Sequence, residues 1–219
     1  MTPGIFETMR AADGEVALLS AHLARLRTSA VALGLACPDD VDLERKVRGA
    51  LADGGAYRLR LDLGPSGDVR TAVAPMPENR PVRLARISGY DPVGPARHKL
   101  RDRPDYEQAA AAALRSGADH PLLVSSDAQP GETDHANLFA VIDGQLVTPP
   151  RGGILPGIAR ALIIERLGAR ETAISATALE RAAEVFLTNA LRGVIVVTAI
   201  DGQPCSSGAL ARAATTVLQ

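Results

Sequence analysis

Aromatic residues and cysteines are scarce in this sequence. It contains no tryptophan, three phenylalanines and three tyrosines in 219 residues, which argues against the aromatic platforms on which single-stranded nucleic acids stack. Its two cysteines, Cys37 and Cys205, are too far apart for a zinc motif and too few for a disulfide framework. We therefore expect a protein of a reducing compartment, the cytoplasm.

Long apolar segments and an excess of one charge are also missing. No apolar run approaches the ~20 residues that cross a bilayer, and the segment from Met1 to Arg10 lacks the basic and apolar stretches of a signal peptide. A formal net charge of -1 indicates neither a nucleic-acid nor a membrane partner. The hydrophobic fraction of 46% can support a packed core. We expect one large globular domain or two small ones.

The first third of the chain predicts strands and helices closed by glycines. Asp13-Gly14 is a strong hairpin signal, and Ser20 can cap the helix that follows. Leu59, Leu61 and Leu63 alternate with polar residues, which is typical of a half-buried strand. The predicted strands are Ile5 to Arg10, Glu15 to Leu19, Tyr57 to Leu63 and Asp68 to Ala74. The predicted helices are His22 to Leu33, ended by Gly34, and Leu43 to Leu51, closed by Gly54 and Gly55.

A proline-rich segment from Pro75 to Pro81 is the best linker candidate. It divides the chain into a smaller domain, 1–78, and a larger domain, 82–219, which carries Lys99. The larger domain mixes helices and strands that do not strictly alternate, which favours an α+β fold in two lobes. Its predicted helices are Tyr106 to Arg115 and Pro156 to Leu167, and its predicted strands are Val82 to Ser88, Leu122 to Ser125, Leu138 to Ile142, Glu184 to Leu187 and Val194 to Ile200.

Lys99 lies in an unusually cationic segment, Arg97 to Arg103. Neighbouring positive charges disfavour the ammonium form of a lysine, which lowers its pKa and frees the amine for carbonyl chemistry. Taken alone, this segment is better explained by a solvated basic loop.

Two further segments carry candidate groups. Glu132 and Asn137 lead into an apolar strand, where a carboxylate can hold a ring nitrogen protonated, although both side chains are also compatible with an ordinary turn. The glycine-rich loop from Arg151 to Arg160 precedes a helix, so the N–H groups near Gly157, Ile158 and Ala159 can bind a phosphate. Glycine loops before helices are common without a ligand.

Arg58 and Arg60 project from one face of the strand Tyr57 to Leu63. Their guanidinium groups can supply a countercharge to a phosphate. A solvated strand face is the simpler explanation of this pair.

Taken together, these segments resemble the class IV, or fold-type IV, pyridoxal-phosphate enzymes from about Gly4 to Gly202. This family includes branched-chain and D-amino-acid aminotransferases and 4-amino-4-deoxychorismate lyase. The matching motifs, in family order, are Phe6-Glu7-Thr8 with Leu19 to Leu26, His98-Lys99 with Arg103 and Tyr106, Glu132 with Asn137-Leu138-Phe139, Thr148-Pro149-Pro150 with Leu155 to Ile158 and Arg160, and Glu184 to Gly193. The resemblance implies an α+β, D-amino-acid-aminotransferase-like architecture of two domains with the cofactor in the interdomain cleft.

The resemblance also assigns roles to individual residues. Lys99 is implied to hold pyridoxal 5′-phosphate as a Schiff base and to carry the proton, and Glu132 to meet the pyridine nitrogen. The phosphate is implied to lie at Gly157, Ile158 and Ala159, with Asn189 and Ala190 closing its other side and Arg58, ahead of Arg60, as the phosphate arginine. Ala190 departs from the family pattern, since many members have a serine or threonine there. No metal is implied.

Within the family, the motifs around Lys99 and in Thr188 to Gly193 are most similar to those of aminodeoxychorismate lyase. The resemblance implies elimination of pyruvate from 4-amino-4-deoxychorismate to give 4-aminobenzoate for folate synthesis. An aminotransferase acting on a branched-chain or D-amino acid is the alternative, and a non-catalytic binding protein on the same fold is the third. The family also implies a small-molecule amino substrate and a homodimer.

Overall fold

The computed structural model describes residues 4–51, 54–91 and 97–218, which form two compact units. The first consists of the described residues of Met1–Glu78 together with His98–Asp102, and the second of those of Asn79–Arg97 and Arg103–Gln219. Lys99 therefore belongs to the first unit and not, as the sequence predicted, to the larger C-terminal part. The reason is backbone pairing: the Phe6 N–H donates to the carbonyl of Lys99 at 2.9 Å, and the Arg101 N–H donates to that of Gly4 at 2.9 Å.

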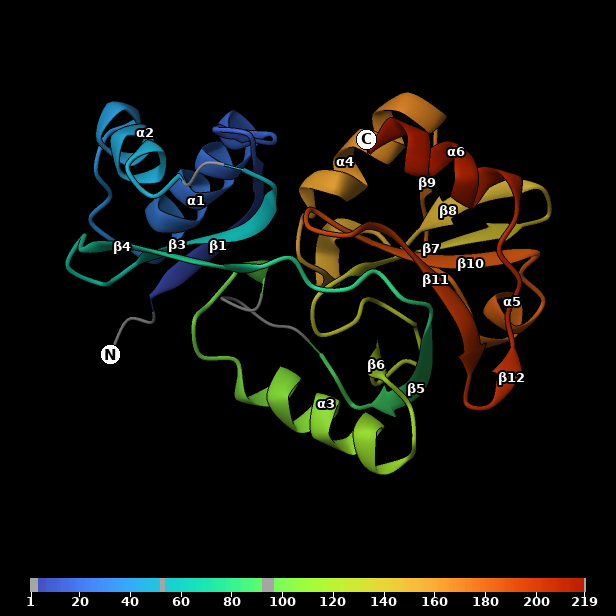
Figure 1. Cartoon of the computed structure of the whole chain (residues 1–219). Helices are drawn as coiled ribbons and strands as arrows, with labels where there is room; N and C mark the ends of the chain where they lie inside the picture. Colours follow the sequence, from blue (N-terminus) through green and yellow to red (C-terminus); the bar gives the residue numbers. More distant parts are fainter. Residues whose placement is uncertain (1–3, 52–53, 92–96, 219) are drawn as a thin grey trace. The chain divides into compact units, whose positions relative to one another are not determined.

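A four-stranded antiparallel sheet forms the frame of the first unit, with strand order β2-β1-β3-β4 (Figure 1). The strands are β1 (Ile5–Ala12), β2 (Glu15–Val16), β3 (Ala56–Leu63) and β4 (Val69–Pro75). Asp13 and Gly14 both have positive φ, 51° and 78°, as a two-residue hairpin turn of type I′ requires. The second strand is shorter than predicted, because Leu18 adopts a left-handed conformation and a helix begins at Leu19.

Helices α1 (Leu19–Leu33) and α2 (Asp40–Arg48) cover one face of this sheet (Figure 1). The alternation predicted for β3 is confirmed, since Leu59, Leu61 and Leu63 are fully buried in a core shared with both helices. Ser20 does not cap α1, because it already lies within the helix. The second helix begins earlier than predicted, where the Asp39 carboxylate accepts the N–H of Asp42 at 2.9 Å, and it ends at Arg48, with Gly49 as its C-cap.

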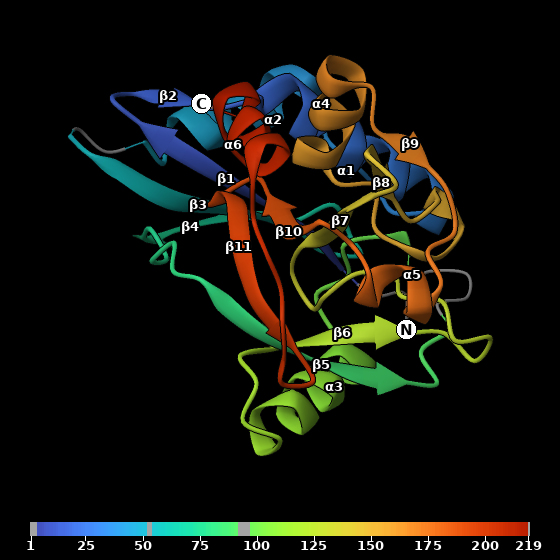
Figure 2. The same cartoon turned by 90° about the vertical axis from the view of Figure 1, so that its right-hand side faces the viewer.

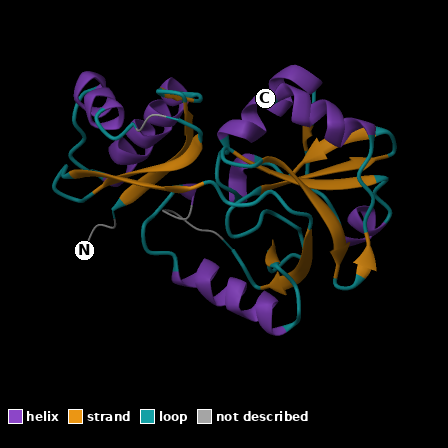
Figure 3. Cartoon of the chain, in the orientation of Figure 1, coloured by secondary structure: helices purple, strands orange, loops and turns teal. Residues whose placement is uncertain are grey.

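The second unit is built on an eight-stranded mixed sheet (Figure 3). Seven strands follow the order β6-β5-β11-β10-β7-β8-β9, and β12 pairs with β11; the β6-β5, β5-β11 and β8-β9 pairs are parallel. The strands are β5 (Val82–Ser88), β6 (His120–Val124), β7 (Asn137–Ile142), β8 (Gln145–Thr148), β9 (Arg170–Glu171), β10 (Glu184–Asn189), β11 (Gly193–Ile200) and β12 (Gln203–Pro204).

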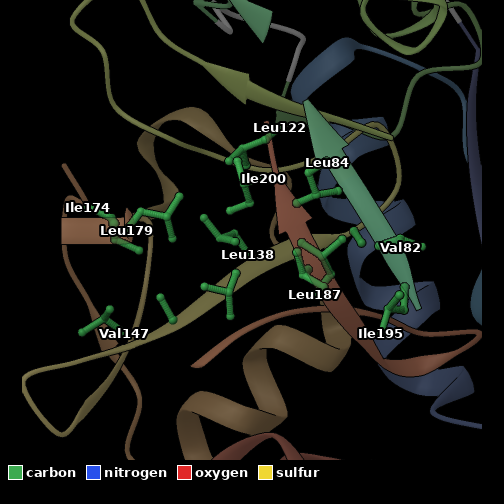
Figure 4. Close-up of a cluster of buried hydrophobic side chains, with 14 residues drawn as sticks. Val82, Leu84, Leu122, Leu138, Val147, Ile174, Leu179, Leu187, Ile195 and Ile200 are labelled. Carbon is green, nitrogen blue, oxygen red and sulfur yellow. The ribbon is translucent and has the colours of Figure 1, made fainter. Parts of the chain in front are cut away.

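Two hydrophobic cores lie on this sheet. One contains Leu138, Leu187 and Ile195 on neighbouring strands (Figure 4). The other contains the stacked rings of Phe139 and Phe186, 5.3 Å apart, and is covered by α4 and α6, which contact each other (Figure 2). The helices are α3 (Pro104–Arg115), α4 (Ile158–Leu167), α5 (Ala176–Glu180) and α6 (Ala209–Val217), with a 3₁₀ turn at Arg151–Gly153. Among the described residues, no helix combines the length and apolarity needed to span a bilayer.

Candidate active site

Lys99 is half-buried in the first unit, in a segment held at two points. Its backbone is tied to β1 through the bond from Phe6 and a bridge between Ile5 and Leu100. Its neighbour His98 is bonded to α1, with Nδ1 3.0 Å from the hydroxyl of Ser29. The segment therefore presents the lysine from a fixed backbone and not from a loose basic loop.

The amine of Lys99 lies against an aromatic ring. Its Nζ is 4.7 Å from the centroid of Phe6, and the guanidinium carbon of Arg60 is 3.7 Å from the same centroid. Arg60 also donates from Nε and Nη2 to the carboxylate of Asp62, at 2.8 Å each. Arg58 lies two residues earlier on the same strand face and is exposed. Lys99 and the arginines predicted to neutralise the phosphate are thus all in the first unit.

A buried charged cluster in the first unit has no role in the sequence-based prediction. Glu7, 1% exposed, accepts hydrogen bonds from Arg25 Nε at 2.8 Å and Nη2 at 2.6 Å, and its Oε2 is 2.7 Å from Nδ1 of His22. Burial raises the pKa of Glu7, but the charge of Arg25 and the hydrogen bonds outweigh it and lower that pKa to about 2. Burial lowers the pKa of His22. The sequence signal that could have indicated this cluster is the spacing of His22 and Arg25, which are three residues apart and so lie on one face of α1. That face contacts Glu7 on β1.

Glu132 is the central acceptor of the second unit. It is 3% exposed and receives the hydroxyl of Tyr106 at 2.8 Å, the side-chain amide of Asn137 at 3.1 Å and the backbone N–H of Leu155 at 3.1 Å. Burial, followed by the charge of Glu132, raises the pKa of Tyr106, so the phenol stays protonated and donates. Three protein donors therefore fix the position and orientation of this buried carboxylate.

The loop before α4 approaches Asn137 closely. Asn137 donates to the carbonyl of Leu155 at 3.0 Å, and a Cβ on Gly157 would lie 1.9 Å from its side-chain oxygen. Only glycine fits at this point. The helix that follows has no side-chain N-cap, so the first N–H groups, including those of Ile158 and Ala159, begin the helix without a capping side chain. These donors and the helix dipole favour an anion.

Thr188 supplies a second signal at the same place. Its side chain is 1% exposed, and its hydroxyl has no hydrogen-bond partner among the residues that the structure describes. Thr188 pairs with Asn137 across β10 and β7, so both face the same side of the sheet, where Gly157 packs on Asn137. A buried hydroxyl without a partner is costly. Its place beside a helix N-terminus fits the phosphate of the implied cofactor.

The turn after β10 contains the other predicted phosphate groups. The side-chain oxygen of Asn189 accepts the N–H groups of Leu191 at 3.0 Å and Arg192 at 2.8 Å. Asn189 therefore shapes the turn that carries Ala190. In the second unit the fold brings together the three predicted segments of Glu132, Gly157 to Ala159 and Asn189 to Ala190.

Arg160 anchors the loop from the side of α4. It is 2% exposed and donates to the carbonyl of Pro149 at 2.7 Å, to the hydroxyl of Thr148 at 3.3 Å and to the carboxylate of Glu171 at 3.0 Å. These contacts hold the end of β8, which precedes the glycine-rich loop, against α4, which follows the loop. The arginine of this motif is thus a structural clamp.

Comparison with known proteins adds to this geometry. The family described as amino-transferase class IV matches residues 4–200. A Schizosaccharomyces pombe protein with the provisional name aminodeoxychorismate lyase is 28% identical over 203 residues, which cover 84% of this chain and 87% of that protein. A fold IV-transaminase structure from Curtobacterium pusillum is 27% identical, covers 99% of this chain and 84% of that one, and has a TM-score of 0.86. A Legionella pneumophila structure provisionally named 4-amino-4-deoxychorismate lyase is 26% identical, with coverage of 99% and 90% and a TM-score of 0.86.

Proposed function

The chain belongs to the class IV aminotransferase family, and from this premise we propose that it is a pyridoxal-phosphate-dependent lyase that eliminates pyruvate from 4-amino-4-deoxychorismate. The family is pyridoxal-phosphate-dependent, and the predicted fold-type IV architecture is confirmed by the similarity to solved structures of that fold. The product is 4-aminobenzoate, a precursor in folate synthesis.

A comparison of the two lysines in the sequence identifies the amine that we assign to the cofactor. The chain contains two lysines, Lys46 and Lys99. Lys46 is exposed on α2, a helix that packs on the opposite face of the sheet from the polar residues of β3. Lys99 is half-buried against Phe6 on a segment tied to β1. Lys99 is therefore the side chain that we assign to covalent attachment of the cofactor aldehyde.

The remaining cofactor contacts are assigned to the second unit. Glu132 would hold the pyridine nitrogen protonated, and the N–H groups of Ile158 and Ala159 with the hydroxyl of Thr188 would bind the phosphate. When bound, pyridoxal phosphate supplies an electron sink for a carbanion next to the substrate amine. The observation that supports this fit is the buried hydroxyl of Thr188, which has no hydrogen-bond partner among the described residues and lies on the side of the sheet where Gly157 packs on Asn137.

The proton step is assigned to Lys99. Lys99 would hold the cofactor aldehyde, and its amine, when free, would remove the proton from the carbon that bears the substrate nitrogen. The enolpyruvyl group would leave as enolpyruvate, which would take up a proton and become pyruvate, with 4-aminobenzoate as the other product. The contact of Lys99 Nζ with the Phe6 ring, 4.7 Å from its centroid, and the pairing of the backbone with β1 would position the amine for this step.

The lyase is favoured over a transaminase by two relatives. The Schizosaccharomyces pombe and Legionella pneumophila proteins both bear a lyase name and align with at least 84% of this chain. The Curtobacterium pusillum transaminase, at 27% identity, supports an aminotransferase as the second candidate. The two reactions share every step up to proton removal. They differ in whether pyruvate leaves or the amino group is transferred.

Incubation of the purified chain with pyridoxal phosphate and 4-amino-4-deoxychorismate tests the proposal. We expect 4-aminobenzoate and pyruvate in equal amounts, and none from Lys99→Ala. Borohydride reduction followed by peptide mass spectrometry should place the cofactor on Lys99, and Lys46→Ala should keep both the label and the activity. Transfer of an amino group to 2-oxoglutarate without pyruvate release would replace the lyase by the aminotransferase. A chain that takes up no cofactor would exclude both.

We also propose that the active form is a cytoplasmic homodimer, as the family resemblance implies. Light scattering on the purified chain should give twice the chain mass of 22.8 kDa. A mass of one chain at working concentrations would remove this part of the proposal without affecting the assignment of Lys99.

A further inference from the structure

Four side chains form a half-buried polar network in the second unit, next to the turn after β10. Asp134 Oδ1 lies 2.8 Å from Nδ1 of His135 and 3.3 Å from Nδ1 of His120. On its other side, His135 Nε2 is in contact with Nη2 of Arg192. The network joins the loop that follows Glu132, the start of β6 and the turn 189–193, which are far apart in the sequence.

The contact with Arg192 determines the protonation of His135. A guanidinium group only donates hydrogen bonds, so Nε2 of His135 must carry a lone pair, and the ring proton must sit on Nδ1, where it donates to Asp134. The neutral ring thereby acts as acceptor and donor at once. Any second proton on the ring has to be placed on Nε2, directly against a positive charge.

Arg192 stabilises the turn 189–193 through its backbone N–H, its carbonyl and its guanidinium group. Its N–H donates to the side chain of Asn189, its carbonyl accepts from Asn79 Nδ2 at 3.0 Å, and its guanidinium reaches His135. Asn189 also donates to the backbone carbonyl of His135, at 3.4 Å. The conformation of the turn that carries Ala190 is therefore tied to His135 through both a side chain and the backbone.

We propose that His135 is a positioning residue that holds the turn 189–193 in shape through Arg192, and that protonation of His135 releases this turn. The consequence for cofactor phosphate binding rests on the proposed function, which places Ala190 at the phosphate. The effect on the turn itself does not depend on it.

The charges around His135 support a neutral ring near neutral pH. Burial lowers the pKa of His135, the carboxylate of Asp134 raises it, and His120 and Arg192 lower it further. The carboxylate itself stays ionised, because hydrogen bonds from both histidines outweigh the effect of burial and lower the pKa of Asp134. Arg80, paired with Asp119 at 3.1 Å, adds a positive charge near Arg192. Since the folded-state pKa of His135 is below its ordinary value of 6.5, the turn is held at neutral pH and released as the pH falls through the lowered pKa.

A divalent cation is the competing explanation of the same cluster. His120, Asp134 and His135 offer ligand atoms within 4.8 Å of one another. A metal on Nδ1 of His135 would displace the proton there while Nε2 still accepts from Arg192, which requires an imidazolate ring beside an arginine. The contact with Arg192 therefore favours the hydrogen-bonded network.

Amide exchange in the cofactor-free chain tests the positioning role directly. The reporters are the N–H groups of Leu191 and Arg192, both bonded to Asn189, with rates corrected for the intrinsic effect of pH. Between pH 7.5 and a pH below the lowered pKa of His135, approached in steps down to pH 4, we expect their protection to fall about tenfold in the wild type, the factor that corresponds to losing one hydrogen bond of a charged group. His135→Gln places an amide oxygen at the position of Nε2, so it should keep the protection at both pH values.

His135→Asn is the matched variant, because its side chain is too short to reach Arg192. It should show the lowered protection at both pH values, as should Arg192→Met, with melting temperatures showing that the variants are folded. Wild-type protection in His135→Asn, or the same pH response in His135→Gln as in the wild type, would overturn the proposal. Protection that rises with micromolar Zn²⁺ and is lost in His120→Asn would instead establish a metal site.

Titration with pyridoxal phosphate separates this inference from the proposed function. Cofactor affinity should follow the amide protection across the same variants and pH values. A chain that binds no cofactor at any pH, yet shows the expected exchange pattern, would refute the proposed function and leave the role of His135 intact.

Discussion

Replacing Thr188 with valine should change stability and cofactor affinity in opposite directions. The Thr188 hydroxyl is buried without a partner among the described residues, and such a group costs about 1–3 kcal/mol. Valine has nearly the same shape and suits a strand, so the cofactor-free variant should gain about 1 kcal/mol, or about 2–4 °C in melting temperature for a chain of this length. If the hydroxyl binds the cofactor phosphate, the same change removes a hydrogen bond to a charged group, worth about 1.5–3 kcal/mol. Affinity for pyridoxal phosphate should then fall about 10- to 100-fold.

Thr148→Val is the matched control. Thr148 is also fully buried in a strand of the same sheet, but its hydroxyl donates to the carbonyl of Leu138 at 2.7 Å and accepts from Arg160 Nε at 3.3 Å. The same substitution there leaves two buried groups unpaired, so we expect a loss of about 1–3 kcal/mol. Differential scanning fluorimetry and cofactor titration of both variants provide the comparison.

Two results would refute the reasoning about Thr188. A lower melting temperature of Thr188→Val without cofactor would mean that the hydroxyl has a partner in the folded chain. A more stable variant with wild-type cofactor affinity would mean that the hydroxyl does not contact the phosphate. In the second case the helix N-terminus at Ile158 and Ala159 would remain the candidate anion site.

Further predictions concern Glu7 and Gly157. Because the pKa of Glu7 is lowered from 4.5 to about 2, its ionised form contributes up to about 3 kcal/mol above pH 4.5, and this is lost as the pH falls toward 2. The free energy of unfolding in urea, measured between pH 7 and pH 2, should not show this loss in Glu7→Gln. The control variant Glu44→Gln, at a position on α2, should show the same loss as the wild type. Gly157→Ala should lower the melting temperature, because the new Cβ would lie 1.9 Å from the Asn137 side-chain oxygen and displace that side chain. Gly152→Ala, with open space around it, should be neutral; equal melting temperatures would contradict this packing argument.

The local sequence pattern was sufficient to predict a strand or helix where that element alone determines its bounds and its buried face. The alternation of Leu59, Leu61 and Leu63 predicted both a strand and its buried face, because side chains of a strand point to alternate sides. The strand Val82–Ser88 was predicted with the bounds that the structure has. In contrast, α6 was not predicted, because its N-terminus is capped from β10, where Glu184 accepts the N–H groups of Gly208 and Ala211.

The candidate site divides in the same way. Glu132, Gly157 and Asn189 stand in short motifs that sequence alone can mark, since each depends on a local loop and the element next to it. The sequence also marked Lys99 but assigned it to the wrong unit, because strand pairing with Gly4 and Phe6 joins residues almost a hundred positions apart.

The amino-acid sequence by itself determined the family and most of the longer strands and helices, and it marked Lys99 as the candidate for the cofactor-binding lysine. Tertiary structure alone decided that the Thr188 hydroxyl has no hydrogen-bond partner in the described part of the chain, that three donors converge on Glu132 and that His135 contacts Arg192, 57 residues away. The physical reason is that hydrogen-bond satisfaction of a buried group depends on every element that packs around it. Local sequence specifies only one of those elements.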